Sequence, residues 1–131
     1  MGLAEHYSNM SSCERNKVGC VFVFGRRVIS GGYNESPSGL PHCQGEKVCN
    51  SSGLGCQTTI HAEENAIINA ARNGVSLMGS SAYCSLLPCP KCFGKMVNAG
   101  VEEIVFKHEY RINEAKQMAE RLGIKLRKIE P

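Results

Sequence analysis

The sequence predicts a three-layer α/β/α sandwich around a mixed sheet of about five strands. Its 131 residues are enough for one core, so a single domain over residues 1–131 is expected. In the second half, strand patterns alternate with helical patterns, which favours parallel strands with helices on both faces of the sheet. A predicted hairpin in the first half adds antiparallel pairing and makes the sheet mixed.

The first half contains a short helix, the hairpin and a long polar segment. The helix is predicted to end near Ser11. β-Branched and aromatic residues at 18–25 and 28–34 flank a turn at residues 25–27, a pattern typical of two strands joined as a hairpin. Residues 35–59 are rich in Ser, Gly, Pro, Asn and Cys and have few apolar side chains. A loop of this length is functional, disordered or tied by a metal.

The second half contains three helices and three strands. In the helix predicted over 60–73, Ala66, Ile67 and Ala70 share one face, and Gly74 ends the helix. The remaining predicted elements are a strand at 80–86, a helix at 88–99, a strand at 101–107, a helix at 113–122 and a strand at 124–129.

Composition excludes several classes of protein. All 12 acidic residues are Glu, which excludes a Ser-His-Asp triad, an EF-hand loop and a kinase-type metal aspartate. The net charge of +3 is too small to imply a surface dedicated to nucleic acid. The sequence has no apolar run long enough for a membrane span and no secretory signal at its start, so a cytoplasmic protein without a membrane partner is expected. Eight cysteines in such a protein favour metal binding or burial over the alternative of an extracellular disulfide scaffold.

Two short motifs at predicted helix starts have the spacing of a metal site. His61-Ala62-Glu63 opens one helix, and Cys89 and Cys92 open another. Thiolates are favoured at a helix N-terminus, and two sulfurs with one imidazole give zinc three protein ligands. The fourth position is then left for water, which is typical of catalytic zinc. Bound water acidifies to near neutral pH, so hydroxide becomes available as the nucleophile.

Glu63 is predicted to be the proton shuttle of this site. It lies two residues past the histidine, where its carboxylate can face the metal without binding it and can move protons between water and substrate. Taken alone, Cys89 and Cys92 also fit a redox pair or a structural zinc site, although a structural site is expected to have a fourth ligand. The combination matches the signature of zinc nucleobase deaminases.

Longer stretches extend this match to one family. The segment HAEENA at 61–66 resembles the HAE-x-NA signature of deoxycytidylate (dCMP) deaminases. Similar stretches cover nearly the whole chain: SSCERNKVGCV, ISGGYNESPSGLPHC, AARNGVSLMG, SLLPCPKC and KHEYR. The resemblance implies the cytidine-deaminase fold, hydrolysis of dCMP to dUMP and ammonia in thymidylate synthesis, and a homohexamer.

The resemblance also implies substrate contacts. Arg15 matches the family's phosphate-contacting arginine, and a guanidinium binds phosphate oxygens bidentately. The alternative for Arg15 is a solvated side chain at a strand entrance. Asn34 resembles the family's sugar-contacting asparagine, and Tyr110 matches an aromatic residue that packs on the sugar or base or, alternatively, covers the core. The base is expected to meet Glu63 and backbone groups beside Ala62 and around Ser85.

Regulated members of the family hold dCTP or dTTP as effectors, with Mg²⁺ on the triphosphate. By resemblance, Tyr33 and Asn65 are candidate effector contacts. Taken alone, an asparagine at a helix start such as Asn65 is most often a solvated surface residue. Glu35 stands where the family has a glycine in this region. A carboxylate there repels a triphosphate unless its side chain points away.

The other cysteines predict a second metal. Cys20 and Cys84 lie inside predicted strands, where thiols fill core space. The remaining four suit a closed structural zinc site that orders the long loop: Cys13, Cys43, Cys49 and Cys56. His42 is a candidate substitute for one of them, because some dCMP deaminases have such a site with Cys and His ligands. The alternative is that these are reduced free thiols.

Two other functions compete with hydrolysis of a free nucleotide. One is a polynucleotide deaminase acting on tRNA or single-stranded DNA, and the other is a zinc module without activity. A polynucleotide channel needs basic and stacking aromatic residues, yet only 6% of residues are aromatic and Trp is absent. An intact Glu63 and an open coordination position disfavour the inactive module. A small substrate, and no nucleic-acid partner, is therefore expected.

Overall fold

The computed structural model describes residues 1–13, 16–37, 59–109 and 114–129. Within these ranges, five strands form one mixed sheet in the order β2-β1-β3-β4-β5. The strands β1, β2 and β3 pair antiparallel, whereas β3, β4 and β5 pair parallel. The elements in chain order are α1 (Gly2–Ser8), β1 (Gly19–Phe24), β2 (Arg27–Tyr33), α2 (Ala62–Arg72), β3 (Ser81–Leu86), α3 (Pro90–Asn98), β4 (Glu103–His108), α4 (Ala115–Leu122) and β5 (Lys125–Lys128).

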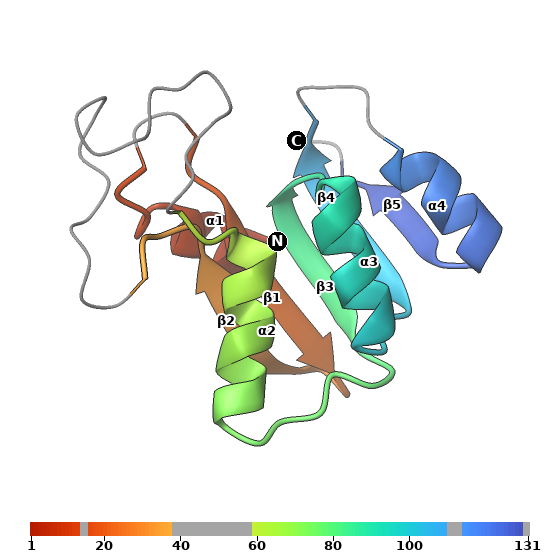
Figure 1. Cartoon of the computed structure of the whole chain (residues 1–131), viewed down its shortest axis with the longest axis horizontal. Coiled ribbons are helices and arrows are strands. Elements are labelled where there is room, and N and C mark those ends of the chain that lie inside the picture. Colours follow the sequence, from red (N-terminus) through yellow and green to blue (C-terminus); the bar gives the residue numbers. More distant parts are fainter. Residues whose placement is uncertain (14–15, 38–58, 110–113, 130–131) are drawn as a thin grey trace.

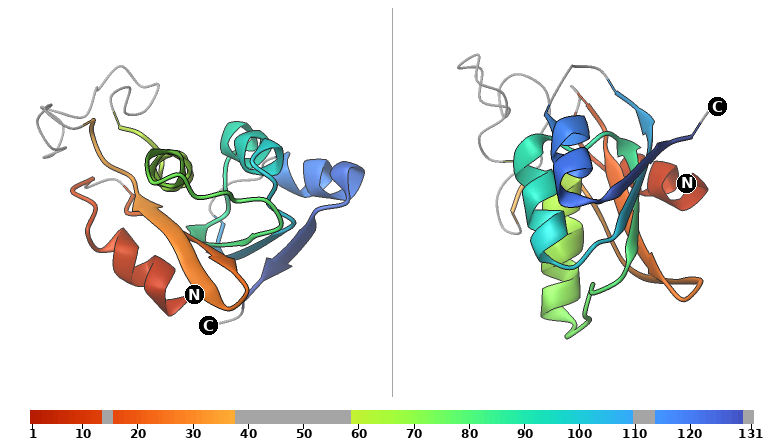
Figure 2. Two further views of the ribbon diagram at one scale, coloured as in Figure 1. Left: turned by 90° about the horizontal axis from the view of Figure 1, so that it is seen from below. Right: turned by 90° about the vertical axis from the view of Figure 1, so that its right-hand side faces the viewer.

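The sheet lies between two helical layers, as predicted. Figure 2 shows α1 on one face and α2, α3 and α4 on the other. The parallel half of the sheet follows the strand–helix alternation of the sequence, since each of its connections passes through a helix. Among the described residues, none of the helices combines the length and the hydropathy that a membrane crossing requires.

The first helix is shorter than predicted. It ends at Ser8 with Asn9 as its C-cap, three residues before Ser11. The Ser11 hydroxyl instead donates a hydrogen bond to the main-chain oxygen of Asn34, 2.7 Å away. Past Ser8 the main chain continues in turns, with the Ser11 amide donating to the Ser8 oxygen at 3.2 Å. No local pattern in the sequence signals the bond from Ser11 to Asn34. The other predicted elements are found with ends that differ by at most two residues.

A two-residue loop connects β1 and β2 in the hairpin. Phe24 pairs with Arg27, and the residues between them, Gly25 and Arg26, have φ of 58° and 66°. Two positive φ angles are what a type I′ turn requires, and this turn matches the twist of the strands that it joins.

Glycines allow the helices to approach the hairpin from both faces. A Cβ on Gly19 of β1 would lie 1.9 Å from the Ala4 oxygen of α1. A Cβ on Gly32 of β2 would lie 2.5 Å from the Ala66 nitrogen of α2. Both helices therefore pack against bare backbone, which fixes the position of α2 and of the residues at its start.

The predicted core cysteines are confirmed. Cys20 of β1 and Cys84 of β3 are directly opposed in the sheet register and completely buried, and their sulfurs are 3.5 Å apart. They join a core whose largest buried side chains include Phe22, Phe93 and Met96. This core includes Ala62 and Phe93 from the first turns of α2 and α3. Figure 1 shows these two helices side by side on the sheet.

Candidate active site

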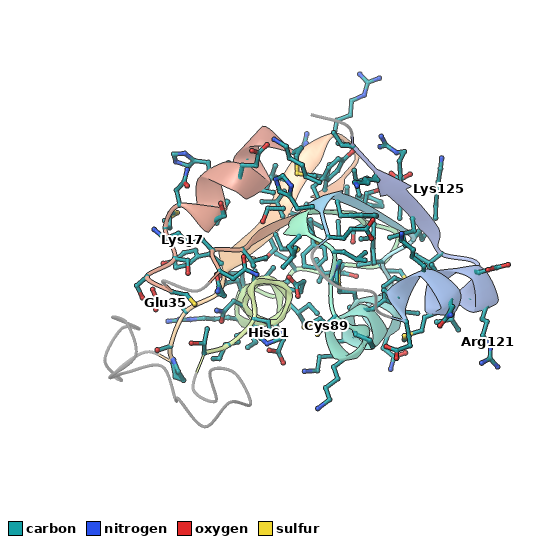
Figure 3. The ribbon with its side chains drawn as sticks, turned by 90° about the horizontal axis from the view of Figure 1, so that it is seen from above. Lys17, Glu35, His61, Cys89, Arg121 and Lys125 are labelled. Carbon is teal, nitrogen blue, oxygen red and sulfur yellow. The ribbon has the colours of Figure 1, made fainter. Side chains whose placement is uncertain are left out.

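The site is built from the starts of two neighbouring helices. His61 is the N-cap of α2, and Cys89 is the N-cap of α3, with Pro90 as the first helical residue. Proline suits this position because its missing N–H would have no helical partner there. Figure 3 shows His61 and Cys89 next to each other between these helix ends.

Three side chains bring ligand atoms together with zinc-like spacing. The His61 Nδ1 atom lies 3.8 Å from the Cys89 sulfur and 3.4 Å from the Cys92 sulfur. All three ligand atoms lie within 4.8 Å of one another. Tetrahedral zinc with bonds of about 2.3 Å to sulfur and about 2.0 Å to nitrogen separates such atoms by about 3.5 Å. The donor set therefore fits zinc and leaves one position without a protein ligand from this group.

The protonation of the two thiols is asymmetric. Hydrogen bonds from Cys92 and His61 lower the pKa of Cys89 to about 4, against the opposing effect of partial burial. The pKa of Cys92 is raised, because Cys92 holds its proton against the Cys89 thiolate and is itself buried. The pKa of His61 is also raised, chiefly by its hydrogen bond with Cys89. Metal binding to this set is therefore expected to release a proton.

Glu63 is the buried carboxyl group of the site. Its side chain is 4% exposed, although charged residues are rarely buried without a partner. Burial raises the pKa of Glu63 to about 7, while a hydrogen bond with Cys92 and the charge of His61 act in the opposite direction. A carboxyl group with this pKa exchanges protons readily near neutral pH.

The two residues predicted to flank the base, Ala62 and Ser85, are both buried. Ala62 is buried in the first turn of α2. The Ser85 hydroxyl of β3 is also buried and accepts a hydrogen bond from the Gly19 amide at 3.0 Å. Ser85 therefore links β3 to β1 whether or not it also meets a ligand.

Asn34, the predicted sugar contact, is engaged by its own protein. Its Oδ1 accepts a hydrogen bond from the Val18 amide at 2.9 Å, and its Nδ2 donates to the Asn16 oxygen at 2.7 Å. Its main chain also pairs with Val18 and accepts the Ser11 hydroxyl. The buried Asn34 amide thus holds the segment that leads into β1.

The two predicted effector contacts are also joined to each other. Asn65 Nδ2 donates to the Tyr33 main-chain oxygen at 2.8 Å, which ties α2 to the end of β2. The Tyr33 ring faces Tyr7 of α1, with ring centroids 6.5 Å apart. Both residues therefore help to pack the helices on this end of the sheet.

The Glu35 carboxylate is hydrogen-bonded within the protein, to Ser12 and Ser36. Its Oε1 accepts hydrogen bonds from the Ser12 hydroxyl at 2.6 Å and from the Ser36 amide at 3.0 Å. The Glu35 main chain makes two hydrogen bonds with Ile60, which precedes the metal-site histidine. These two bonds hold Glu35 and Ile60, the residues on either side of positions 36–59, next to each other.

Glu64 lies beside the site and was not singled out in the sequence. Its Oε1 accepts a hydrogen bond from the His61 amide at 3.1 Å, and its Oε2 forms an ion pair with Lys95 of α3. A glutamate three residues after a helix cap is a capping-box pattern, so the first contact has a sequence signal. The ion pair has none, because Lys95 is 31 residues away along the chain.

Several predicted site residues lie outside the described ranges. They are Arg15, His42, Cys43, Cys49, Cys56 and Tyr110. Cys13, the fourth predicted ligand of the second zinc, is described and is 5% exposed.

Comparison with known proteins agrees with this geometry. The profile of the cytidine and deoxycytidylate deaminase zinc-binding region matches residues 1–108. The chain is 39% identical to a deoxycytidylate deaminase of Saccharomyces cerevisiae over 119 residues, which cover 87% of this chain and 38% of the relative. It is 35% identical to a deoxycytidylate deaminase of Schizosaccharomyces pombe over 141 residues, covering 100% of this chain and 43% of the relative. The chain thus spans about two fifths of the length of these curated relatives.

A solved structure matches nearly the whole fold. The dCMP deaminase of the cyanophage S-TIM5, crystallised with dCMP and dUMP, superimposes with a TM-score of 0.88 and 32% identity. The superposition covers 98% of this chain and 92% of the phage enzyme. The five-stranded sheet and its helical layers are therefore shared along almost the full length of both chains.

Proposed function

Because this chain belongs to the cytidine and deoxycytidylate deaminase family, we propose that it hydrolyses dCMP to dUMP and ammonia. The observation that carries the proposal is the convergence of His61, Cys89 and Cys92 on one point beside the buried carboxyl group of Glu63. The nucleotide is supported by the names of the relatives and by the dCMP and dUMP bound to the cyanophage enzyme.

Zinc is the cofactor that this donor set fits. His61 Nδ1 and the sulfurs of Cys89 and Cys92 would hold the ion. When bound, zinc acidifies a water molecule and so supplies the nucleophile near neutral pH. The lowered pKa of Cys89 favours the thiolate that zinc requires before the metal arrives.

Glu63 is proposed to move the protons of the reaction. Its carboxylate takes one proton from the attacking water and passes it to the ring nitrogen N3. It then takes the second proton of the same oxygen and passes it to the leaving amine, which departs as ammonia. A pKa of about 7 lets the same group act in both directions. Its burial also excludes bulk water from the proton path.

The remaining substrate contacts are proposed from the resemblance. Arg15 binds the 5′-phosphate, Asn34 contacts the sugar, and Tyr110 packs on the sugar or base. Groups beside Ala62 and around Ser85 meet the base. Because the described hydrogen bonds of Asn34 already use one acceptor and one donor position of its amide, one lone pair and one N–H are left for a sugar hydroxyl.

Side-by-side assays of dCMP, deoxycytidine, cytidine and a cytosine-containing oligonucleotide test the proposal. We expect dCMP to have the highest kcat/KM, and Arg15→Ala to reduce the preference for dCMP over deoxycytidine about tenfold or more. Faster turnover of the oligonucleotide would instead support a polynucleotide deaminase. An unchanged preference in Arg15→Ala would contradict the phosphate contact alone.

A second, structural zinc is proposed at Cys13, Cys43, Cys49 and Cys56, with His42 as the substitute ligand. It is supported by the burial of Cys13, which is 5% exposed and whose amide donates to the Ser11 hydroxyl oxygen at 3.1 Å. Elemental analysis is expected to give two zinc ions per chain. Cys49→Ser should lose one ion and lower the melting temperature, whereas His61, Cys89 and Cys92 stay loaded. One ion per chain with these thiols freely titratable would contradict the second site.

Assembly, effectors and location are proposed on the resemblance alone. They are a homohexamer, dCTP and dTTP as effectors with Mg²⁺, and a cytoplasmic location. Sedimentation of the purified protein tests the hexamer. Assays with dCTP and dTTP in Mg²⁺ test regulation, for which the position of the Glu35 carboxylate beside Ser12 is the relevant structural feature.

A further inference from the structure

One carboxylate connects the two helices that carry the metal ligands. Glu64 lies in the first turn of α2, and one of its oxygens accepts the amide proton of His61. Its other oxygen forms an ion pair with Lys95 of α3. Both ends of the contact therefore lie close to a ligand: one at His61 itself, the other one turn beyond Cys92 on the same helix.

This contact acts where the ligand geometry is set. His61 Nδ1 and the Cys92 sulfur are 3.4 Å apart, close to the separation that tetrahedral zinc needs, and they belong to different helices. A small shift of α2 along α3 would change this distance. Among the ion pairs of the described residues, the Glu64–Lys95 pair is the one that joins α2 to α3.

We propose that Glu64 and Lys95 form a brace that holds His61 against Cys92 and so increases the affinity of the site for zinc. Both are positioning residues, since neither belongs to the group of ligand atoms. The side chains of Lys95 and Glu64 are 51% and 27% exposed, so the ion pair by itself contributes little to stability. Its effect is expected on zinc affinity, because contacts that orient metal ligands influence how tightly the metal is bound. The inference rests on the zinc site proposed above.

The test compares zinc affinity in variants that break the brace. Glu64→Gln keeps an oxygen for the His61 amide but removes the ion pair, and Lys95→Met removes the ammonium at similar length. We expect each to weaken zinc binding about fivefold in competition with a chromogenic chelator, and to release zinc faster. The double variant should bind zinc about as tightly as the single variant with the lower zinc affinity, since both changes break the same contact.

Two controls separate the brace from charge and folding effects. Lys91→Met removes the same charge from the same helix, next to Cys92, and Lys107→Met breaks the ion pair with Glu5 between β4 and α1. Both should bind zinc as tightly as the parent. Equal affinity in Glu64→Gln and the parent, an equal loss in Lys91→Met, or additive losses in the double variant would overturn the brace. Zinc binding is measured without substrate, so a failure of dCMP turnover alone would count against the proposed function and not against the brace.

Discussion

The starts of α2 and α3 differ from the end of β2 in how their polar side chains are used. At the helix starts, Cys89 and Glu63 have strongly shifted pKa values, and the metal-ligand atoms face one another. At the end of β2, the Asn34 amide bonds to main-chain atoms of Val18 and Asn16, and the Tyr33 oxygen accepts a hydrogen bond from the Asn65 amide of α2. Groups perturbed by burial and by each other are available for chemistry, whereas groups that satisfy the main chain hold the shape around it.

The largest effect is expected from replacing the buried carboxyl group. Glu63→Gln should lower kcat for dCMP about 10³-fold, because the proton shuttle is lost while all three zinc ligands remain. Zinc content measured on the same sample should be unchanged. Glu120→Gln, on an exposed face of α4, is the matched control and should keep full activity. Retained turnover in Glu63→Gln would contradict the assignment of the proton shuttle.

The same substitution should stabilise the zinc-free protein at high pH. The pKa of Glu63 is raised from 4.5 to about 7 in the folded state, so folding becomes less favourable as the pH rises through this window. A shift of this size corresponds to about 3 kcal/mol, the largest gain expected for Glu63→Gln above pH 7. Below pH 4.5 the carboxyl group is protonated in both states, and the gain should vanish.

Denaturant unfolding of zinc-free parent and variant at pH 5 and pH 8 measures this difference. Glu120→Gln should show no comparable dependence on pH. A gain that is the same at both pH values would mean that the charge of Glu63 is not the cause.

The metal site was predictable from sequence because its spacing is local. Cys89 and Cys92 are one helical turn apart, and His61 and Glu63 belong to one helix start, so a few residues contain most of the geometry. The alternation of strands and helices likewise predicted the sheet and its layers. Local periodicity determines these features, and the sequence displays it directly.

The surroundings of Asn34 were not predictable in the same way. Its partners Val18 and Asn16 are 16 and 18 residues away, and the Glu64 partner Lys95 is 31 residues away. A polar residue on a strand end has many such partners available, and only the packed fold selects one. The bond from the Ser11 hydroxyl to the Asn34 oxygen spans 23 residues and is likewise not visible in the local sequence.

A smaller effect is expected from Asn34→Ala. The substitution leaves the buried Val18 amide and the Asn16 oxygen without their partner, which should cost about 2 kcal/mol of unfolding free energy. If the amide also contacts the sugar, KM for dCMP should rise while zinc content is unchanged. A stable variant with a normal KM would show that Asn34 serves neither role.

The smallest effect is expected from Asn65→Ala, which removes one hydrogen bond between half-buried partners. The loss of the bond to the Tyr33 oxygen should lower the unfolding free energy by about 1 kcal/mol. Asn98→Ala, on an exposed position at the end of α3, is the control and should change stability by less than about 0.5 kcal/mol. Assays with dCTP then separate the two roles of Asn65. If the side chain only ties α2 to β2, the variant should respond to dCTP as the parent does. A lost response at unchanged zinc content would place Asn65 among the effector contacts. Asn65 would then bind a ligand as well as a main-chain atom, and the contrast between the two regions would not hold for this residue.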